Sequence, residues 1–181
     1  MKKLFDEIPY IDNGRIILKK LEETDSEALL ELIRSKPVYR YLPTFLFEQQ
    51  FGDDMHEMIR ELYSDCFVRK ESLIMGVYLK EGMRFCGLAE YYGYKDAIHK
   101  TCLGYRLMES YWGQGIASEA VAMMVDYCYS QTDIEIITAS TMIENRASAR
   151  DLEKNGFIMT ATAVPEDWGY SEPTIADKWF R

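Results

Sequence analysis

The sequence has few of the residues from which metal centres and disulfide frameworks are built. Its four cysteines form no C-x-x-C pair, and its two histidines do not lie at a spacing that would complete a zinc site. Zinc sites and disulfide-stapled scaffolds depend on such spacings, so we expect neither a metal nor a disulfide. The cysteines are expected to be reduced, mostly buried thiols of a cytoplasmic protein. They are Cys66, Cys86, Cys102 and Cys128.

Long hydrophobic runs are also missing. No apolar stretch reaches the length of about 18 residues that a membrane-spanning helix needs. The N-terminal stretch MKKLFDEIPYIDN carries two lysines, but Asp6 and Glu7 interrupt it, so it does not resemble a signal peptide. We therefore expect no membrane partner and a cytoplasmic location.

Positive charge is scarce, because 21 Lys and Arg residues face 30 Asp and Glu residues, for a formal net charge of −9. Proteins that bind nucleic acid present a basic face to the phosphates, so nucleic acid is not an expected partner. An acidic surface attracts cationic ligands such as amines. A net negative charge also serves solubility alone, and both interpretations stay open.

The chain contains neither internal repeats nor a linker rich in Pro, Ser or Gly, so residues 1–181 are expected to form a single domain. Hydrophobic periodicity and turn residues predict a mixed α/β fold around one central sheet. A capping box at Thr24–Glu27 is expected to start the first helix, and Pro37 to end it. The expected strands are 14–20, 72–79, 83–92, 100–108, 134–139, 157–163 and 174–180, and the expected helices cover about 28–36, 55–62, 116–128 and 145–154.

The stretch YWGQGIASEA, residues 111–120, stands between a predicted strand and a predicted helix. Its two glycines, Gly113 and Gly115, allow a sharp turn and a close approach of the backbone to a ligand. The unpaired N–H groups at the start of the helix and the helix dipole favour an anionic phosphate there. The alternative is a glycine turn that only permits tight packing of the helix on the strand.

Two familiar phosphate loops fit this stretch poorly. It has no lysine, so it is not a Walker A loop. GQGIAS nearly matches the Rossmann pattern G-x-G-x-x-[GA], but the preceding MESYW is polar and aromatic rather than an apolar strand. Asp133 and Glu135 lie at about the right distance, yet they open the next strand instead of closing it. On its residues alone, the loop is a pyrophosphate site of modest specificity.

A second segment, ENRASARDLEKNGF (residues 144–157), makes a family resemblance specific. Together with LGYRLMESYWGQGIASEA it resembles the GNAT acetyltransferases, in particular their RimJ/RimL-like branch. The resemblance spans nearly the whole chain, is strongest over residues 103–157, and weakens across 36–70 and 160–175, where substrates would be chosen. It implies a mostly antiparallel mixed sheet that is flanked by helices and splayed between its two middle strands.

The resemblance implies acetyl-CoA as the co-substrate, with no metal. In the family, amides of the glycine loop hold the CoA pyrophosphate and the splayed strand pairs with the pantetheine arm, which here falls to Leu107 and Met108. Trp112 is a mild departure from the family's usual Arg or Gln. The implied cofactor-binding residues are Leu107, Met108, Trp112, Gly113, Gln114, Gly115, Ile116, Ala117, Ser118, Asn145 and Ser148.

The implied chemistry is direct attack of a neutral amine on the thioester, without a covalent enzyme intermediate. Many relatives use a tyrosine as the acid in the second helix; here Ser148 takes its place, although it is also the third residue after the predicted cap Asn145. The implied catalytic residues are Ser148, Glu90 and Tyr111. The base stays open among Glu90, Glu109, Glu166 and Asp167, and Glu119 is interpreted as structural. Tyr39, Tyr41, Phe45 and Trp168 line an acceptor pocket or belong to the core.

Three functions remain open at this point. The first is an N-acetyltransferase acting on a primary amine, either a protein N-terminus or a small cationic amine. The second is a non-catalytic acyl-CoA-binding module, suggested by the missing tyrosine and the uncertain base. The third is a Rossmann-like dinucleotide protein. Dimers are common in the GNAT family, so a homodimer stands as an alternative to a monomer.

Overall fold

The computed structural model describes all 181 residues and contains one eight-stranded sheet of order β1-β2-β3-β4-β5-β6-β8-β7. Six of the neighbouring pairs are antiparallel, and only β5 and β6 are parallel. The expected mixed, mostly antiparallel sheet is therefore confirmed. The strands are β1 (Ile11–Asp12), β2 (Ile16–Lys19), β3 (Ser72–Leu79), β4 (Arg84–Lys95), β5 (Lys100–Leu107), β6 (Ile136–Met142), β7 (Ile158–Glu166) and β8 (Thr174–Phe180).

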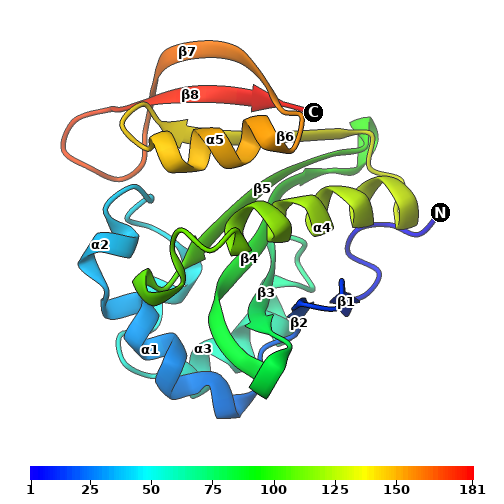
Figure 1. Ribbon diagram of the computed structural model, residues 1–181, viewed down its shortest axis with the longest axis vertical. Coiled ribbons are helices and arrows are strands. Elements are labelled where there is room, and N and C mark those ends of the chain that lie inside the picture. Colours follow the sequence, from blue (N-terminus) through cyan, green and yellow to red (C-terminus); the bar gives the residue numbers. More distant parts are fainter.

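Helices cover both faces of this sheet (Figure 1). Successive side chains of a strand point to opposite faces, and β3 shows the consequence: Leu73 joins the core beneath α4, whereas Ile74 joins the core beneath α1 and α3. None of the helices combines the length and the hydrophobicity needed to cross a bilayer. The helices are α1 (Ser26–Arg34), α2 (Lys36–Tyr39), α3 (Met55–Glu61), α4 (Ile116–Gln131) and α5 (Arg146–Lys154).

The splay of the sheet lies between β5 and β6, which are joined through α4. The two strands pair only where Lys100–Cys102 runs beside Ile136–Thr138. Beyond those residues, β5 continues to Leu107 and β6 to Met142 without pairing to each other. Figure 1 shows the two strands separating, with α4 on one side of the opening and β6, β7 and β8 on the other. The splay leaves backbone groups of β5 free of a strand partner.

Two local predictions need correction. The capping box predicted at Thr24–Glu27 is wrong, because the reciprocal bonds join Glu22 and Asp25 and close a 3-10 turn before α1. The strand predicted at 134–139 runs instead over Ile136–Met142, and buried and half-buried residues alternate along it. The alternation arises because successive side chains of β6 point to opposite faces of the sheet, and Ile137 and Ala139 join the core on one of those faces.

Candidate active site

The chain turns sharply between β5 and α4 at residues 112–115, which we call the glycine loop. Gly113 has φ +70° and Gly115 has φ +78°, so both lie in the left-handed region that disfavours side chains. Gly115 is also the N-cap of α4, and no side chain caps that helix. The start of α4 is therefore left open to a ligand.

Six consecutive backbone N–H groups, from Gly113 to Ser118, donate to no acceptor within the protein. The first bond of α4 runs from Glu119 N to the Gly115 carbonyl, at 3.0 Å. Trp112 differs, because its N–H donates to the Glu109 carbonyl at 3.1 Å. Its amide was predicted to bind the pyrophosphate with the others, but it is not a free donor. A run of unpaired donors at the positive end of a 16-residue helix fits an anion with several acceptor oxygens.

Side chains from elsewhere in the chain hold the glycine loop and the first turn of α4 in place. Arg15 Nη2 donates to the Gln114 carbonyl at 2.9 Å, and the same guanidinium pairs with Glu119. From α5's end, Asn155 Nδ2 donates to the Ser118 carbonyl at 3.0 Å and lies 3.3 Å from Ser118 Oγ. Glu119 therefore pairs with a cation, in agreement with its structural interpretation. These contacts connect the glycine loop to the turn before β2 and the first turn of α4 to the end of α5.

A pocket of about 370 Å³ opens in front of the glycine loop, and we call it the loop pocket. On its α5 side lie Arg150 and Lys154, two cations that form no ion pair within the protein. Met108, Gln114 and Ser118 of the predicted cofactor set do not line the pocket. The members that do are Leu107, Trp112, Gly113, Gly115, Ile116, Ala117, Asn145 and Ser148.

Leu107 and Met108 differ in which way their backbone groups point. Met108 N–H donates to the Cys86 carbonyl at 2.9 Å, and its own carbonyl accepts from Tyr111 N–H at 3.0 Å. Leu107 faces Gly87 as a non-hydrogen-bonded pair, so its N–H and C=O point away from β4 into the splay. The Leu107 carbonyl accepts from Trp112 Nε1 at 2.8 Å. Of the two residues expected to pair with a cofactor arm, only Leu107 has a free N–H directed there.

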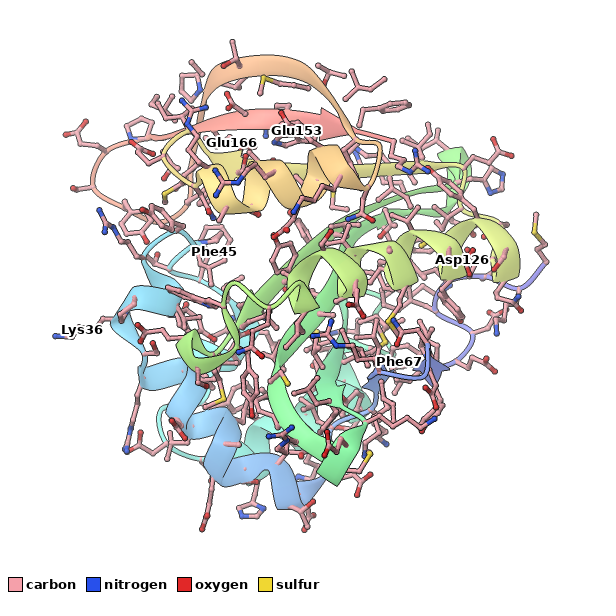
Figure 2. The ribbon with its side chains drawn as sticks, viewed as in Figure 1. Lys36, Phe45, Phe67, Asp126, Glu153 and Glu166 are labelled. Carbon is pink, nitrogen blue, oxygen red and sulfur yellow. The ribbon has the colours of Figure 1, made fainter.

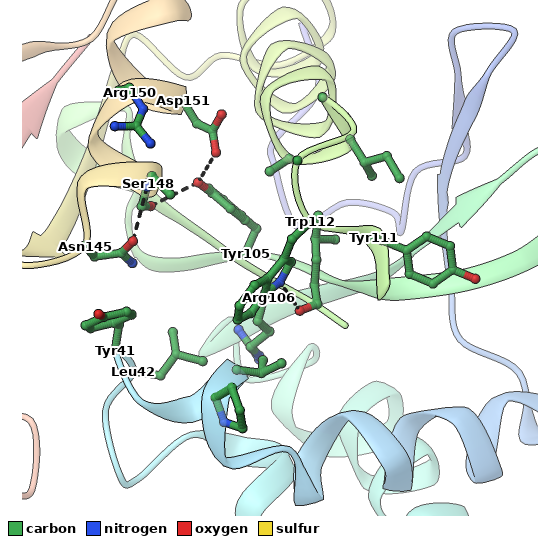
Figure 3. A pocket seen from close by; sticks show the side chains of 18 of the residues that line it. Tyr41, Leu42, Tyr105, Arg106, Tyr111, Trp112, Asn145, Ser148, Arg150 and Asp151 are labelled. Carbon is green, nitrogen blue, oxygen red and sulfur yellow. Dashed lines mark hydrogen bonds between the residues drawn. The ribbon is translucent and has the colours of Figure 1, made fainter. Parts of the chain in front are cut away.

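Ser148 lies at the N-terminal end of α5, where the predicted cap is confirmed: Asn145 Oδ1 accepts from Ser148 N at 3.2 Å. The Ser148 hydroxyl lies 3.0 Å from the Tyr105 hydroxyl, which donates to Asp151 Oδ2 at 2.9 Å (Figure 3). Burial raises the pKa of Tyr105, and the Asp151 carboxylate raises it further. Tyr105 therefore stays protonated at neutral pH.

A second pocket, of about 750 Å³, opens on the other side of Ser148, and we call it the aromatic pocket. Phe45 lines it on the side of α2, and Glu166 lines it on the side of β7 and β8 (Figure 2). Tyr41 and Trp168 also line it, as expected, whereas Tyr39 does not. The two pockets form one continuous cleft, because six residues line both: Tyr41, Leu42, Tyr105, Arg106, Asn145 and Ser148.

Buried charges form the floor of the aromatic pocket. Arg106 Nη1 donates to Glu90 Oε2 and Nη2 to Glu48 Oε2, both at 2.8 Å, and Nε lies 2.6 Å from Glu48 Oε1. Burial alone would lower the pKa of Arg106, but the two carboxylates outweigh it and raise that pKa. Glu48 also accepts from Tyr39, and Glu90 accepts from Ser72. Glu48 is fully buried and does not line the pocket, so of these three charges only Arg106 and Glu90 face it.

The other candidate bases occupy different surroundings. Glu166 lines the aromatic pocket but pairs with Lys178 and accepts from Trp168 Nε1 at 3.0 Å. Asp167 lines the same pocket and accepts only the Gly169 N–H, at 2.9 Å. Glu109 lies outside both pockets and accepts from Ser35 Oγ at 3.2 Å. Of the carboxylates that reach the aromatic pocket, Asp167 is therefore the one without a cationic partner.

Tyr111, predicted as catalytic, lines the loop pocket, but Figure 3 shows its ring directed away from Ser148 and Tyr105. The structure instead brings Tyr105 and Asp151 to Ser148, and neither was predicted as a site residue. The only sequence signals were the G-Y pair at Gly104–Tyr105 and the three-residue spacing from Ser148 to Asp151, and neither shows that β5 meets α5 at this point. No three His, Cys, Asp or Glu side chains gather as a metal site.

The sequence matches the profile of the family described as the acetyltransferase (GNAT) domain, over residues 15–158. Among curated proteins, the uncharacterized N-acetyltransferase YoaA of Bacillus subtilis (strain 168) is 23% identical over 149 residues, which cover 82% of each chain.

Solved structures share the fold at lower identity. RimL, a ribosomal L7/L12 alpha-N-protein acetyltransferase solved with coenzyme A, superposes with a TM-score of 0.79 at 16% identity, over 96% of this chain and 97% of that one. Spermidine N-acetyltransferase from Vibrio cholerae, solved with CoA and spermine, gives a TM-score of 0.76 at 16% identity, over 93% of this chain and 96% of that one. At this identity the likeness concerns the fold.

Proposed function

The chain belongs to the GNAT family of acetyltransferases, whose acetyl donor is acetyl-CoA, and from this premise we propose that it acetylates a primary amine in the cleft formed by the two pockets. The observation that carries the proposal is the run of six unpaired N–H groups, Gly113 to Ser118, in a pocket that continues past Ser148 into a second pocket. One pocket takes the donor and the other takes the acceptor.

The residues of the loop pocket fit the anionic part of coenzyme A. A diphosphate presents several acceptor oxygens, and the six free N–H groups at the start of α4 offer a matching number of donors. Leu107 N–H points into the splay beside them and suits the amide-bearing arm of the same molecule. Acetyl-CoA, when bound, supplies an acetyl group activated as a thioester.

Ser148 is placed to serve the reacting end, since it lines both pockets. Its hydroxyl donates a hydrogen bond to the sulfur as negative charge develops there, which lowers the barrier to departure of the thiolate. Asn145 fixes the backbone of Ser148 through its cap. The serine acts through a hydrogen bond and forms no covalent bond to the acyl group.

The aromatic pocket receives the amine. Four carboxylates (Glu71, Glu90, Glu166 and Asp167) line this pocket against three cations (Lys100, Arg106 and Lys178), a balance that favours an ammonium group. Aromatic walls such as Tyr41 and Trp168 pack on its carbon chain or bind the cation through their ring faces. Glu90 already accepts from Arg106 and Ser72 through its two oxygens. Asp167, without a cationic partner, is the carboxylate that takes the proton from the amine.

Two proteins of the same fold suggest candidate classes of acceptor. RimL is an alpha-N-protein acetyltransferase, and the Vibrio enzyme acts on spermidine. We therefore propose a protein N-terminus or a small cationic amine, and the acidic balance of this chain favours a cationic acceptor.

Thiol release from acetyl-CoA, measured over a panel of spermidine, spermine, an aminoglycoside and peptides with free N-termini, tests this function. Turnover with at least one amine, and its acetylated product in the mass spectrum, are the expected results. Tight CoA binding with no turnover on any amine would instead support a non-catalytic acyl-CoA-binding module. Binding of NAD in place of CoA, seen as a thermal shift, would support the dinucleotide alternative.

A further inference from the structure

One tyrosine joins β5 to two side chains of α5. Tyr105 Oη lies 3.0 Å from Ser148 Oγ and 2.9 Å from Asp151 Oδ2. Ser148 and Asp151 are three residues apart in α5, so both side chains lie on the helix face turned toward β5. No other side chain bonds the Tyr105 hydroxyl, which therefore links the serine and the aspartate alone.

The proton count fixes the direction of these bonds. A tyrosine hydroxyl has a single proton, and the structure directs it to the Asp151 carboxylate. The Tyr105 oxygen is then left as an acceptor, so the Ser148 hydroxyl is the donor of the bond between them. In the resting protein the order of donation is Ser148 to Tyr105 to Asp151.

We propose that Tyr105 is a positioning residue for Ser148 and that Asp151 sets the direction in which the Tyr105 hydroxyl points. The inference rests on the proposed role of Ser148 as a hydrogen-bond donor to the departing sulfur. Tyr105 holds Ser148 Oγ between the loop pocket and the aromatic pocket, at the point where the two reactants meet.

The same three groups reverse their bonds without any heavy atom moving. When Ser148 turns its hydrogen toward the developing thiolate, Tyr105 turns its own hydrogen from Asp151 to Ser148 Oγ, because both acceptors lie within 3.0 Å of it. Asp151 is half-buried, so water satisfies the carboxylate that Tyr105 leaves. Only hydroxyl rotations occur, and the bond that Ser148 now accepts makes it a stronger donor.

A double-mutant cycle tests this inference. The variants are Tyr105→Phe, Ser148→Ala and the double variant, assayed for kcat and KM with acetyl-CoA and the panel amine of highest turnover, with Kd for CoA from calorimetry. Tyr94→Phe is the matched control, because Tyr94 also donates to an aspartate, Asp96, at 3.1 Å but lines neither pocket.

We expect each single variant to lower kcat about tenfold, and the double variant to be no slower than Ser148→Ala. Kd for CoA should change less than about twofold, and Tyr94→Phe should match the wild type. Asp151→Asn should keep kcat within about threefold of the wild type, because the amide oxygen still accepts the Tyr105 hydrogen.

Additive losses in the double variant would show that Tyr105 does not act through Ser148, and a loss confined to CoA affinity would show a purely structural role; either overturns the inference. Wild-type kcat in Ser148→Ala would also overturn it while acetyl transfer stands. A wild-type protein that acetylates no amine contradicts the proposed function itself, and the inference fails with it.

Discussion

Arg106 lies in the interior between two carboxylates, and its guanidinium bonds both Glu48 and Glu90. A buried ion pair adds little net stability over apolar packing, but removing one partner leaves the other charge buried and unpaired. Here the guanidinium of Arg106 is the ion-pair partner of both buried carboxylates, Glu48 and Glu90.

Arg106→Met is therefore expected to lower the free energy of unfolding by about 3–5 kcal/mol, as measured by urea denaturation. Methionine keeps much of the volume, so the loss reflects the two unpaired carboxylates. The control is Arg34→Met, which breaks an exposed pair with Asp53 and should leave the denaturation midpoint unchanged. Equal denaturation midpoints for the two variants would contradict the view that Arg106 stabilises the fold by pairing with the buried carboxylates Glu48 and Glu90.

At the scale of residues, the sequence predicted those parts of the site that lie within one segment. The Asn145 cap and the position of Ser148 at a helix start follow from local spacing, and the structure has both. Tyr105 and Asp151 could not be paired in advance, because their contact depends on how β5 packs against α5, 46 residues along the chain. The same holds for Arg106 and Glu48, which lie 58 residues apart.

The element that defines the site is α4 together with the glycine loop that precedes it. Gly115→Asp is expected to lower the affinity for CoA by on the order of a hundredfold, measured by calorimetry, because it places a carboxylate against the diphosphate. Gly82→Asp is the matched control: Gly82 has φ +74° and ψ 9°, Gly115 has φ +78° and ψ −1°, so both variants incur the same backbone strain.

Gly82 lies in the turn between β3 and β4 and lines neither pocket, so the control should bind CoA like the wild type. Unchanged affinity in Gly115→Asp would refute the assignment of the glycine loop to the diphosphate.

Helix α5 contributes charge to the loop pocket through Arg150 and Lys154, which stand one helical turn apart without an acidic partner. With the diphosphate on α4, the remaining phosphate of coenzyme A is its 3′-phosphate. Arg150→Gln with Lys154→Gln should weaken CoA binding about tenfold and leave dephospho-CoA binding unchanged.

The control is Arg146→Gln, on the same helix but outside the pocket, which should alter neither affinity. If the double variant weakened CoA and dephospho-CoA equally, these cations would not recognise the 3′-phosphate.

At the scale of elements, strong periodicity gave the best predictions. The strands predicted at 72–79 and 174–180 coincide with β3 and β8, and the helix predicted at 116–128 lies within α4 and starts at the same residue. Predictions were weaker where tertiary contacts decide. The strand predicted at 134–139 begins two residues later, at Ile136, and extends to Met142. The start of α1 was misplaced because Thr24, Glu22 and Asp25 offer two overlapping capping patterns.

For the whole molecule, the continuity of the two pockets has a kinetic consequence. Both substrates must occupy the cleft at once if the amine attacks the thioester directly. Double-reciprocal plots of initial rate against acetyl-CoA concentration, recorded at several fixed amine concentrations, should therefore intersect. Two thiols line the aromatic pocket, Cys66 and Cys102, and Cys66 is buried whereas Cys102 is partly exposed. Cys102, whose Sγ lies 3.1 Å from Thr138 Oγ1, is therefore the more accessible candidate nucleophile. Cys102→Ser should keep turnover. Parallel lines, or an acetylated wild-type enzyme, would contradict direct transfer.

At this largest scale, the family and the fold were accessible from the sequence because the motifs of residues 103–157 are specific, and the family profile confirms the family. The aromatic pocket was accessible only in part. It draws on the segment after α2, on β6 and on the β7–β8 end of the sheet, which meet only in the folded chain. The homodimer stays a prediction.

The central claim is that the free N–H groups at the start of α4 bind the diphosphate of coenzyme A. Amide proton–nitrogen correlation spectra of the ¹⁵N-labelled protein, recorded while CoA is added, observe those groups individually. The account predicts that Gly113 to Ser118 show the largest shifts, and that Trp112, whose amide is already bonded, moves less. Saturable binding of CoA that leaves these six amides unmoved and shifts resonances elsewhere would contradict it.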